Sequence, residues 1–127
     1  MPPPIPLFDA RDYLESVGLA RPAVKFGRNA SVFRQGDVAD HVMYIQSGGV
    51  KLSVVSKAGR EAVVAMLGPG DFFGEGCLAG QKLRMGSATA VTPSAVLRVP
   101  KQAMVGLLHK EHEMSDRFIS GMLTRNI

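Results

Sequence analysis

The residues best suited to bind a charged ligand lie in one segment in the second half of the chain. Gly74, Glu75 and Gly76 form a glycine-rich bend, and Arg84 follows Glu75 by nine positions. A loop or short helical turn opening at this bend exposes backbone N–H groups, and glycine lets an anion approach them closely. The planar guanidinium of Arg84 can bind the same anion through two charge-assisted hydrogen bonds. The segment therefore predicts a phosphate-sized anion site.

Glu75 narrows the chemistry of the expected ligand. A carboxylate beside an anion site is useful only when the ligand also carries hydroxyl groups that donate to it, as a ribose 2′-hydroxyl does. Phosphate together with ribose indicates a nucleotide. The simpler alternative is a weak ion pair between Glu75 and Arg84 across a surface turn. Cys77, Met85 and Ser87 lie close by in the sequence and complete the expected ligand contacts.

Other chemistries find little support. The single cysteine, Cys77, excludes an intramolecular disulfide and multi-thiolate metal sites, and we expect it to be a small buried side chain. His109 and His112 are expected on a solvated helix face, and His41 as an isolated residue on a surface strand. The chain has no His-x-His pair and no Gly-x-Ser-x-Gly elbow. We therefore predict no catalytic residues, no metal site and no enzymatic activity.

Short apolar segments separated by glycine turns must hold the site in place. Runs rich in β-branched and aromatic residues predict strands at 24–26, 31–33, 42–45, 50–55, 61–67, 88–91 and 95–99. The turns that separate them include 35–37, 47–49, 57–60 and 68–71. Many short strands predict a mainly β fold, an antiparallel β-roll or jelly roll, also called a double-stranded β-helix.

Helical periodicity occurs near both ends of the chain. A short N-terminal helix is predicted at 8–17, and a second short helix at 101–108. A longer helix is predicted at 111–127, where apolar side chains recur every four residues. Such an apolar stripe needs a surface to pack against.

Length and composition favour one globular domain. The 127 residues are 46% hydrophobic and 20% charged, and the 15 lysines and arginines are scattered, so direct nucleic-acid binding is not expected. The chain lacks a membrane-spanning run and a signal peptide, so we expect a cytoplasmic protein. We divide it into an N-terminal arm with a short helix (1–21), a β-roll (22–109) and the start of a truncated C-terminal helix (110–127). The side chains expected in the core, rather than on a stacking face, are Phe33, Tyr44, Val54, Val64, Phe72, Phe73 and Leu97.

The ordered set of glycine turns resembles a known family. The segments that carry the resemblance are 33–37 (FRQGD), 44–48 (YIQSG), 50–52 (VKL), 59–61 (GRE), 67–75 (LGPGDFFGE) and Arg84. They look like the cyclic-nucleotide-binding domain of bacterial Crp/Fnr-type transcription regulators, from about residue 24 to the end of the chain. The resemblance implies a β-roll in which Gly74, Glu75 and the following backbone contact ribose and phosphate while Arg84 binds the cyclic phosphate. It implies cyclic AMP or cyclic GMP as effector and no tightly bound cofactor.

The resemblance also implies partners and a way to signal. In this family the helix after the roll forms the dimer interface and transmits the ligand signal, and a helix-turn-helix beyond it binds DNA. We therefore expect a homodimer through the C-terminal helix, with DNA bound only by a segment beyond Ile127. Ligand binding is expected to change the packing of Phe72, Phe73 and Leu78 against that helix.

One departure from the family pattern leaves a second function open. The family commonly has Ser or Thr directly after the phosphate arginine, whereas this chain has Met85, which offers no hydroxyl. Ser87 is the next hydroxyl along the chain. The alternative is an interaction or dimerisation module that binds no nucleotide or a different small effector.

Overall fold

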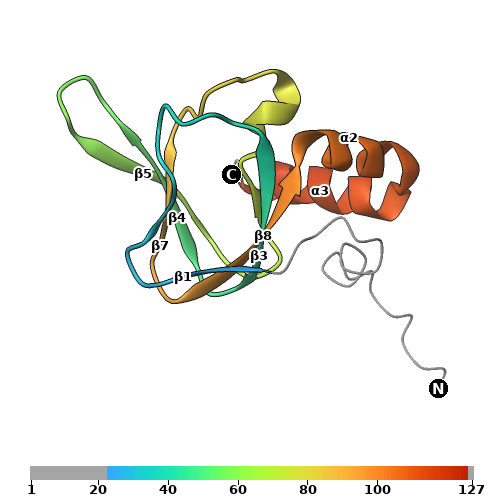
Figure 1. Ribbon diagram of the computed structural model, residues 1–127, viewed down its shortest axis with the longest axis horizontal. Helices are drawn as coiled ribbons and strands as arrows, with labels where there is room; N and C mark the ends of the chain where they lie inside the picture. Colours follow the sequence, from blue (N-terminus) through green and yellow to red (C-terminus); the bar gives the residue numbers. More distant parts are fainter. Residues whose placement is uncertain (1–22, 126–127) are drawn as a thin grey trace.

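Two antiparallel sheets and two α-helices make up the part of the chain that the computed structural model describes, residues 23–125 (Figure 1). At 114, 117 and 121–125 only the backbone is described. The first sheet has the order β1-β8-β3-β6 and the second the order β2-β7-β4-β5. The elements are β1 (Val24–Phe26), β2 (Ser31–Phe33), β3 (His41–Ser47), β4 (Val50–Val55), β5 (Glu61–Leu67), β6 (Phe72–Phe73), the 3-10 helix η1 (Glu75–Ala79), β7 (Ser87–Ala90), β8 (Ser94–Pro100), α2 (Lys101–Lys110) and α3 (His112–Arg125). The predicted mainly antiparallel β fold is confirmed.

The first sheet is buried on both faces along most of β3, whereas β1 at its edge is largely exposed. Side chains alternate along β3, so that Met43 and Ile45 pack between the two sheets while Val42 and Tyr44 pack on the helix side. All four side chains are buried. This explains why β3 reads as an unbroken apolar run in the sequence and not as an alternating one.

The hairpin of β4 and β5 projects beyond the first sheet (Figure 1). β5 is the edge strand of the second sheet and pairs only with β4. Val54 and Val64 on this hairpin are 36% and 60% exposed, so the prediction that they belong to the core is wrong. No other described element covers this end of the hairpin. The remaining predicted core residues are buried or partly buried: Phe33, Tyr44, Phe72, Phe73 and Leu97.

Two helices cover the outer face of the first sheet. α2 follows β8 directly, and α3 begins after a break at Glu111. Met104, Leu107 and Phe118 are buried against the sheet. The ring of Phe118 lies 5.4 Å from the ring of Phe72 in an edge contact, with the distance measured between centroids. α3 is thereby joined to the strand that leads into the glycine-rich bend.

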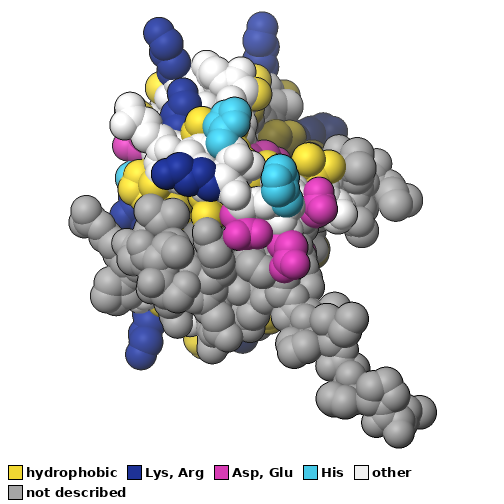
Figure 2. All heavy atoms as spheres, turned by 90° about the vertical axis from the view of Figure 1, so that its right-hand side faces the viewer, with side chains coloured by type: hydrophobic (Ala, Val, Ile, Leu, Met, Phe, Trp, Pro, Cys, Tyr) yellow, Lys and Arg dark blue, Asp and Glu magenta, His cyan; other side chains and the backbone are white. Residues whose placement is uncertain are grey.

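The solvent side of these helices is polar. Histidine, acidic and basic side chains gather on this side of the molecule (Figure 2), and both His109 and His112 are exposed, which confirms the expected solvated face. Among residues 23–125, no three His, Cys, Asp or Glu side chains are grouped so that they could hold a metal ion. No helix in the described part is long and apolar enough to cross a membrane. The helix predicted at 8–17 lies outside the described residues.

Candidate functional site

The glycine-rich bend begins a 3-10 helix, as the sequence predicted. Gly74 precedes η1 with φ 75° and ψ 22°, and Gly80 ends it with φ 90°. These are left-handed conformations that side chains disfavour and glycine adopts readily. A Cβ at Gly76 would collide with the side-chain amide of Gln81. The backbone geometry therefore favours glycine at 74 and 80, whereas at Gly76 the exposed Gln81 side chain could move aside.

Arg84 lies beside this turn and is only 6% exposed. Its Nη1 donates to the carbonyl of Gly74 at 2.8 Å, and its Nη2 donates to the carbonyl of His41 at 2.7 Å. The central guanidinium carbon lies 4.2 Å from the centre of the Phe33 ring. The buried Nε has no hydrogen-bond partner among the described residues. A Cβ at Gly74 would lie 2.8 Å from Nη1, so the close approach of Arg84 also requires a glycine there.

The backbone of Arg84 is fixed by the turn that precedes β3. The Arg84 N–H donates to the carbonyl of Asp37 at 2.7 Å, and its carbonyl accepts from the N–H of Gly36 at 2.8 Å. An isolated antiparallel bridge pairs Val38 with Leu83. Both hydrogen bonds are made by backbone atoms, so the glycine turn at 35–37 positions the backbone of Arg84 whatever the side chains are.

The charge of Arg84 has no carboxylate at ion-pair distance within residues 23–125. Burial lowers the pKa of Arg84, and Cys77, Asp40 and Glu75, when ionised, oppose that shift. The guanidinium stays charged at neutral pH, because the ordinary pKa of an arginine lies far above neutral. A buried charge held only by neutral carbonyls is costly, and such groups are typical of sites that bind an oppositely charged ligand.

Cys77 completes the cluster around the guanidinium. It is fully buried, and its Sγ lies 3.5 Å from the carbonyl oxygen of Gly74 and 3.7 Å from that of His41. Arg84 binds the same two carbonyls. Burial raises the pKa of the Cys77 thiol, so it stays protonated. We call Phe33, His41, Gly74, Cys77 and Arg84 the Arg84 cluster.

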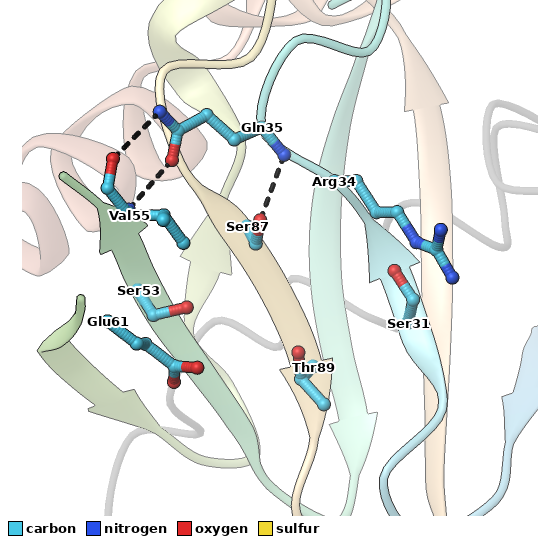
Figure 3. A pocket seen from close by; sticks show the side chains of 8 residues that line it. All are labelled: Ser31, Arg34, Gln35, Ser53, Val55, Glu61, Ser87 and Thr89. Carbon is cyan, nitrogen blue, oxygen red and sulfur yellow. Dashed lines mark hydrogen bonds between the residues drawn. The ribbon is translucent and has the colours of Figure 1, made fainter. Parts of the chain in front are cut away.

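Two of the predicted contact residues lie outside this cluster. Met85 is largely exposed. The Oγ of Ser87 accepts a hydrogen bond from the Gln35 N–H at 2.9 Å, and its side chain lines a groove on the outer face of the second sheet (Figure 3). Glu75 and Gly76, in contrast, form the first turn of η1 beside the cluster. The ligand contacts of all the predicted site residues remain predictions.

Two members of the cluster were not recognised from the sequence. His41 takes part through its backbone carbonyl, a group that every residue carries, so no sequence signal marks it. His41 begins β3 with a partly exposed side chain, and its Nδ1 lies 2.7 Å from Oδ1 of Asp40. Phe33 was expected in the core only, but its ring face lies against the guanidinium of Arg84. The register of β2 shifts between Ser31 and Phe33, so strand alternation in the sequence does not show that Phe33 faces inward.

Comparison with known proteins places this arrangement in a family. Residues 23–111, which include the whole Arg84 cluster, match the family model described as "Cyclic nucleotide-binding domain". The chain belongs to this family. The domain is 35% identical over 113 residues to the global nitrogen regulator of Nostoc sp., a match that covers 87% of the chain and 51% of that protein. It is 29% identical over 102 residues to the CRP-like cAMP-activated global transcriptional regulator of Mycobacterium tuberculosis, covering 80% and 46%.

A solved structure shows the same architecture. The structure of the c-di-GMP responsive global regulator CLP of Xanthomonas campestris matches with a TM-score of 0.81 and 20% identity, over 92% of the chain and 59% of that structure. Identity this low shows a common fold and nothing more. The cyclic nucleotide-binding domain spans about half the length of the two sequence relatives. The resemblance to Crp/Fnr-type regulators that the motifs predicted is confirmed.

Proposed function

We propose that this domain senses a cyclic nucleotide, binds it without catalysis and transmits its presence to α3. The observation that carries the proposal is the buried guanidinium of Arg84, a charge without a carboxylate partner that lies against the glycine-rich turn. Family membership supports it. Because the relatives are named as regulators, we place the domain in a cytoplasmic transcription regulator whose DNA contacts are made by another segment. The division at 22–109 and 110–127 stays part of this proposal.

In this proposal the cyclic phosphate takes over contacts that two backbone carbonyls now make. Nη1 and Nη2 of Arg84 donate to Gly74 and His41. Phosphate oxygens are charged and accept stronger hydrogen bonds than neutral carbonyls do. The unpartnered Nε offers a further donor on the same planar fork. Ligand binding therefore draws the guanidinium away from at least one of the two carbonyls.

Glu75 is proposed to bind the sugar. It is the first residue of η1 and follows Gly74 directly, and its charge is close enough to Arg84 to oppose the lowering of that residue's pKa. A ribose 2′-hydroxyl donates to such a carboxylate, and the N–H groups of the first turn add donors for the phosphate. Cys77 and Gly76 contribute backbone to this turn. Met85 offers no hydroxyl, and the Ser87 side chain lines the groove on the outer face of the second sheet, so the phosphate relies more heavily on Arg84.

The proposed signal reaches α3 through β6 and η1. Phe72 lies two residues before Gly74, and its ring contacts Phe118 of α3. Leu78 of η1 packs against the same core cluster. A movement of η1 on ligand binding thus changes the packing beneath the helices. The sequence-based expectation that Phe73 shares this path is wrong, because Phe73 packs between the sheets with the other core cluster.

A homodimer through α3 is part of the same proposal. Ile119 is an exposed apolar side chain on this helix. An apolar residue at a helix surface suits packing against the same helix of a second copy. Light scattering on size-exclusion fractions of wild type and Ile119→Glu tests this point, with loss of the dimer expected in the variant. A wild-type chain that stays monomeric at high concentration would reject it.

Calorimetric titration with cyclic AMP and cyclic GMP tests the ligand. Both are needed, with cyclic di-GMP as a third ligand, because the names of the relatives state more than one effector. Glu75→Gln is expected to weaken binding of the ribose nucleotide at least about fivefold and to leave its 2′-deoxyribose analogue unaffected. Failure of the wild-type chain to bind any of the three ligands would reject the proposal.

An interaction module that binds no nucleotide is the second candidate. Two observations favour it: Met85 supplies no hydroxyl, and both terminal nitrogens of Arg84 already have carbonyl partners. In this case Arg84 only joins β3 to η1. Thermal unfolding separates the candidates, because a ligand at 100 times its dissociation constant stabilises the folded state by about 2.7 kcal/mol and an interaction module shows no shift.

A further inference from the structure

The outer face of the second sheet carries a groove of about 530 Å³ that the cyclic-nucleotide proposal does not use. We call it the outer-face groove. It lies across β2, β7, β4 and β5, and its lining residues are Ser31, Arg34, Gln35, Ser53, Val55, Glu61, Ser87 and Thr89 (Figure 3). Arg84 is not among them: its guanidinium packs on Phe33, whose side chain contributes to the core between the sheets. The groove is therefore a separate feature of the fold.

The groove exists because short hydroxyl side chains occupy neighbouring outward positions. Ser31 pairs with Thr89 across β2 and β7, and Ser53 pairs with Ser87 across β4 and β7. Strands favour large β-branched and aromatic residues, whose side chains would fill this surface. Strand propensity favours Thr89, but serine is not among the residues that strands favour, so propensity does not account for the three serines in this row. They leave a hollow whose floor is lined with hydroxyl groups.

One wall of the groove is held in a fixed shape. The side-chain oxygen of Gln35 accepts a hydrogen bond from the Val55 N–H at 2.9 Å, and its amide nitrogen donates to the Val55 carbonyl at 3.5 Å. The Gln35 N–H also donates to the Oγ of Ser87 at 2.9 Å. These three bonds tie the loop after β2 to the ends of β4 and β7 (Figure 3). A ligand would meet a surface that needs little further ordering.

Ser53 is the observation that points to a ligand. Ser53 as a whole is only 4% exposed and lines the groove. Its hydroxyl makes no hydrogen bond to any described residue. Among the described residues, the buried side-chain nitrogen or oxygen without a partner is Nε of Arg84, so the Ser53 hydroxyl is still reached from the groove. Water is its partner in the free protein, and a ligand hydroxyl in the groove can replace that water.

The charges at the two sides of the groove differ. Arg34 and Ser31 lie on the β2 side, and Glu61 lies on the β5 side (Figure 3). Glu61 is already paired, because Nζ of Lys51 lies 2.8 Å from its Oε1. Arg34 makes no ion pair within residues 23–125 and is exposed. The free charge at the groove is therefore positive and lies at the Arg34 end.

We propose that the outer-face groove binds a phosphorylated sugar. The phosphate lies at Arg34, the sugar hydroxyls exchange hydrogen bonds with Ser31, Ser53 and Thr89, and the Glu61 carboxylate accepts from a hydroxyl at the far end. The volume is in the range of small-molecule sites, about 300–1,000 Å³. No aromatic side chain lines the groove, so nothing in it stacks a nucleobase, and this separates its ligand from a nucleotide.

NMR titration of the ¹⁵N-labelled chain tests this proposal, with glucose 6-phosphate as the probe. Glucose and inorganic phosphate are titrated separately. The expected result is saturable shifts of the backbone amides of Ser31, Ser53 and Thr89 with glucose 6-phosphate. Each fragment alone should bind at least about tenfold more weakly, because it makes only part of the contacts.

Two substitutions with matched controls assign the contacts. Arg34→Gln should weaken glucose 6-phosphate binding at least about tenfold and Ser53→Ala at least about threefold. Arg98→Gln and Ser47→Ala make similar changes on exposed residues of the first sheet and should leave the affinity unchanged. All variants are surface or small changes, and the amide spectrum of each reports whether it has folded.

Several outcomes would overturn the proposal. Glucose 6-phosphate could give no saturable shifts, or the four variants could bind it equally well. Shifts confined to η1 and Arg84 would place the ligand at the Arg84 cluster instead. Equal affinity for inorganic phosphate and glucose 6-phosphate would show that the row of hydroxyls recognises no sugar. None of these results bears on cyclic-nucleotide binding, which is tested separately by calorimetry.

Discussion

Replacing Arg84 by leucine tests both its structural and its proposed ligand-binding role. The change removes two charge-assisted hydrogen bonds, to Gly74 and His41, worth about 1.5–3 kcal/mol each. It also removes the stacking on Phe33, worth about 0.5–2 kcal/mol. The change also removes the buried Nε that has no partner among the described residues, and this offsets about 1–3 kcal/mol of the lost stability. Taken at the middle of each range, these terms make the unliganded variant less stable by about 4 kcal/mol.

Thermal unfolding with and without cyclic AMP measures both roles in one assay. For a domain of this length, 1 kcal/mol corresponds to about 4 °C, so the unliganded variant should unfold roughly 15 °C below wild type. At 100 times its dissociation constant, the ligand should stabilise wild type by about 2.7 kcal/mol and leave Arg84→Leu unaffected. Arg98→Leu, an exposed arginine on β8, is the matched control and should change stability by less than about 0.5 kcal/mol.

Two results would refute the reasoning separately. An unchanged unfolding temperature of the unliganded variant would show that the carbonyl contacts contribute nothing to stability. An unchanged response to cyclic AMP would show that the phosphate binds elsewhere. If the leucine variant fails to fold, Arg84→Lys serves instead, because it keeps the charge but lacks the planar fork. We expect it to lose most of the ligand response and less of the stability.

Three other changes test the turn, the signal path and the buried thiol. Gly74→Ala should lower the free energy of unfolding, measured by urea titration, by about 2–3 kcal/mol, because the added Cβ meets both a positive φ and the Arg84 side chain. Gly36→Ala is the control: its φ is also positive but the surrounding space is open, so the loss should be about 1 kcal/mol. Phe118→Leu should keep cyclic AMP affinity within about twofold but abolish the ligand-dependent change in hydrogen exchange of α3, and a retained change would contradict the path through Phe72. Burial raises the pKa of Cys77, so the folded state keeps the thiol proton at a pH above about 9, where the unfolded state releases it. The contribution of Cys77 to the free energy of unfolding is therefore present below that pH and is lost as the pH rises above it. Cys77→Ala should therefore make the alkaline fall in unfolding free energy shallower, and an identical pH profile would show that the thiol is not protected.

The sequence predicted the elements of the fold well where side-chain patterns determine them. The longer strands and both C-terminal helices lie within one or two residues of their expected ends. β6 was missed because it is only two residues long and forms through backbone pairing with Met43 and Tyr44, which no local pattern reveals. Val54 and Val64 were placed in the core because an apolar strand predicts burial, and only the topology shows that their end of the hairpin is uncovered.

The candidate site could be predicted only in part, for a related reason. The glycine bend and Arg84 are recognisable because their chemistry resides in residue type. The groups that hold the arginine are backbone carbonyls of Gly74 and His41, and their approach depends on how β3 and η1 pack. The outer-face groove was missed because its hydroxyls come from three strands and meet only through register.

The contribution of His41 through its peptide oxygen has a consequence for the history of this domain. Every amino acid supplies that oxygen, so descendants can replace the imidazole and still restrain the guanidinium. An alignment would then show position 41 as variable, although the carbonyl oxygen that accepts from Arg84 is present in every sequence. Side-chain substitutions at position 41 would therefore show little effect on stability. A backbone ester there, which weakens the acceptor oxygen, should lower stability by weakening the hydrogen bond from Arg84.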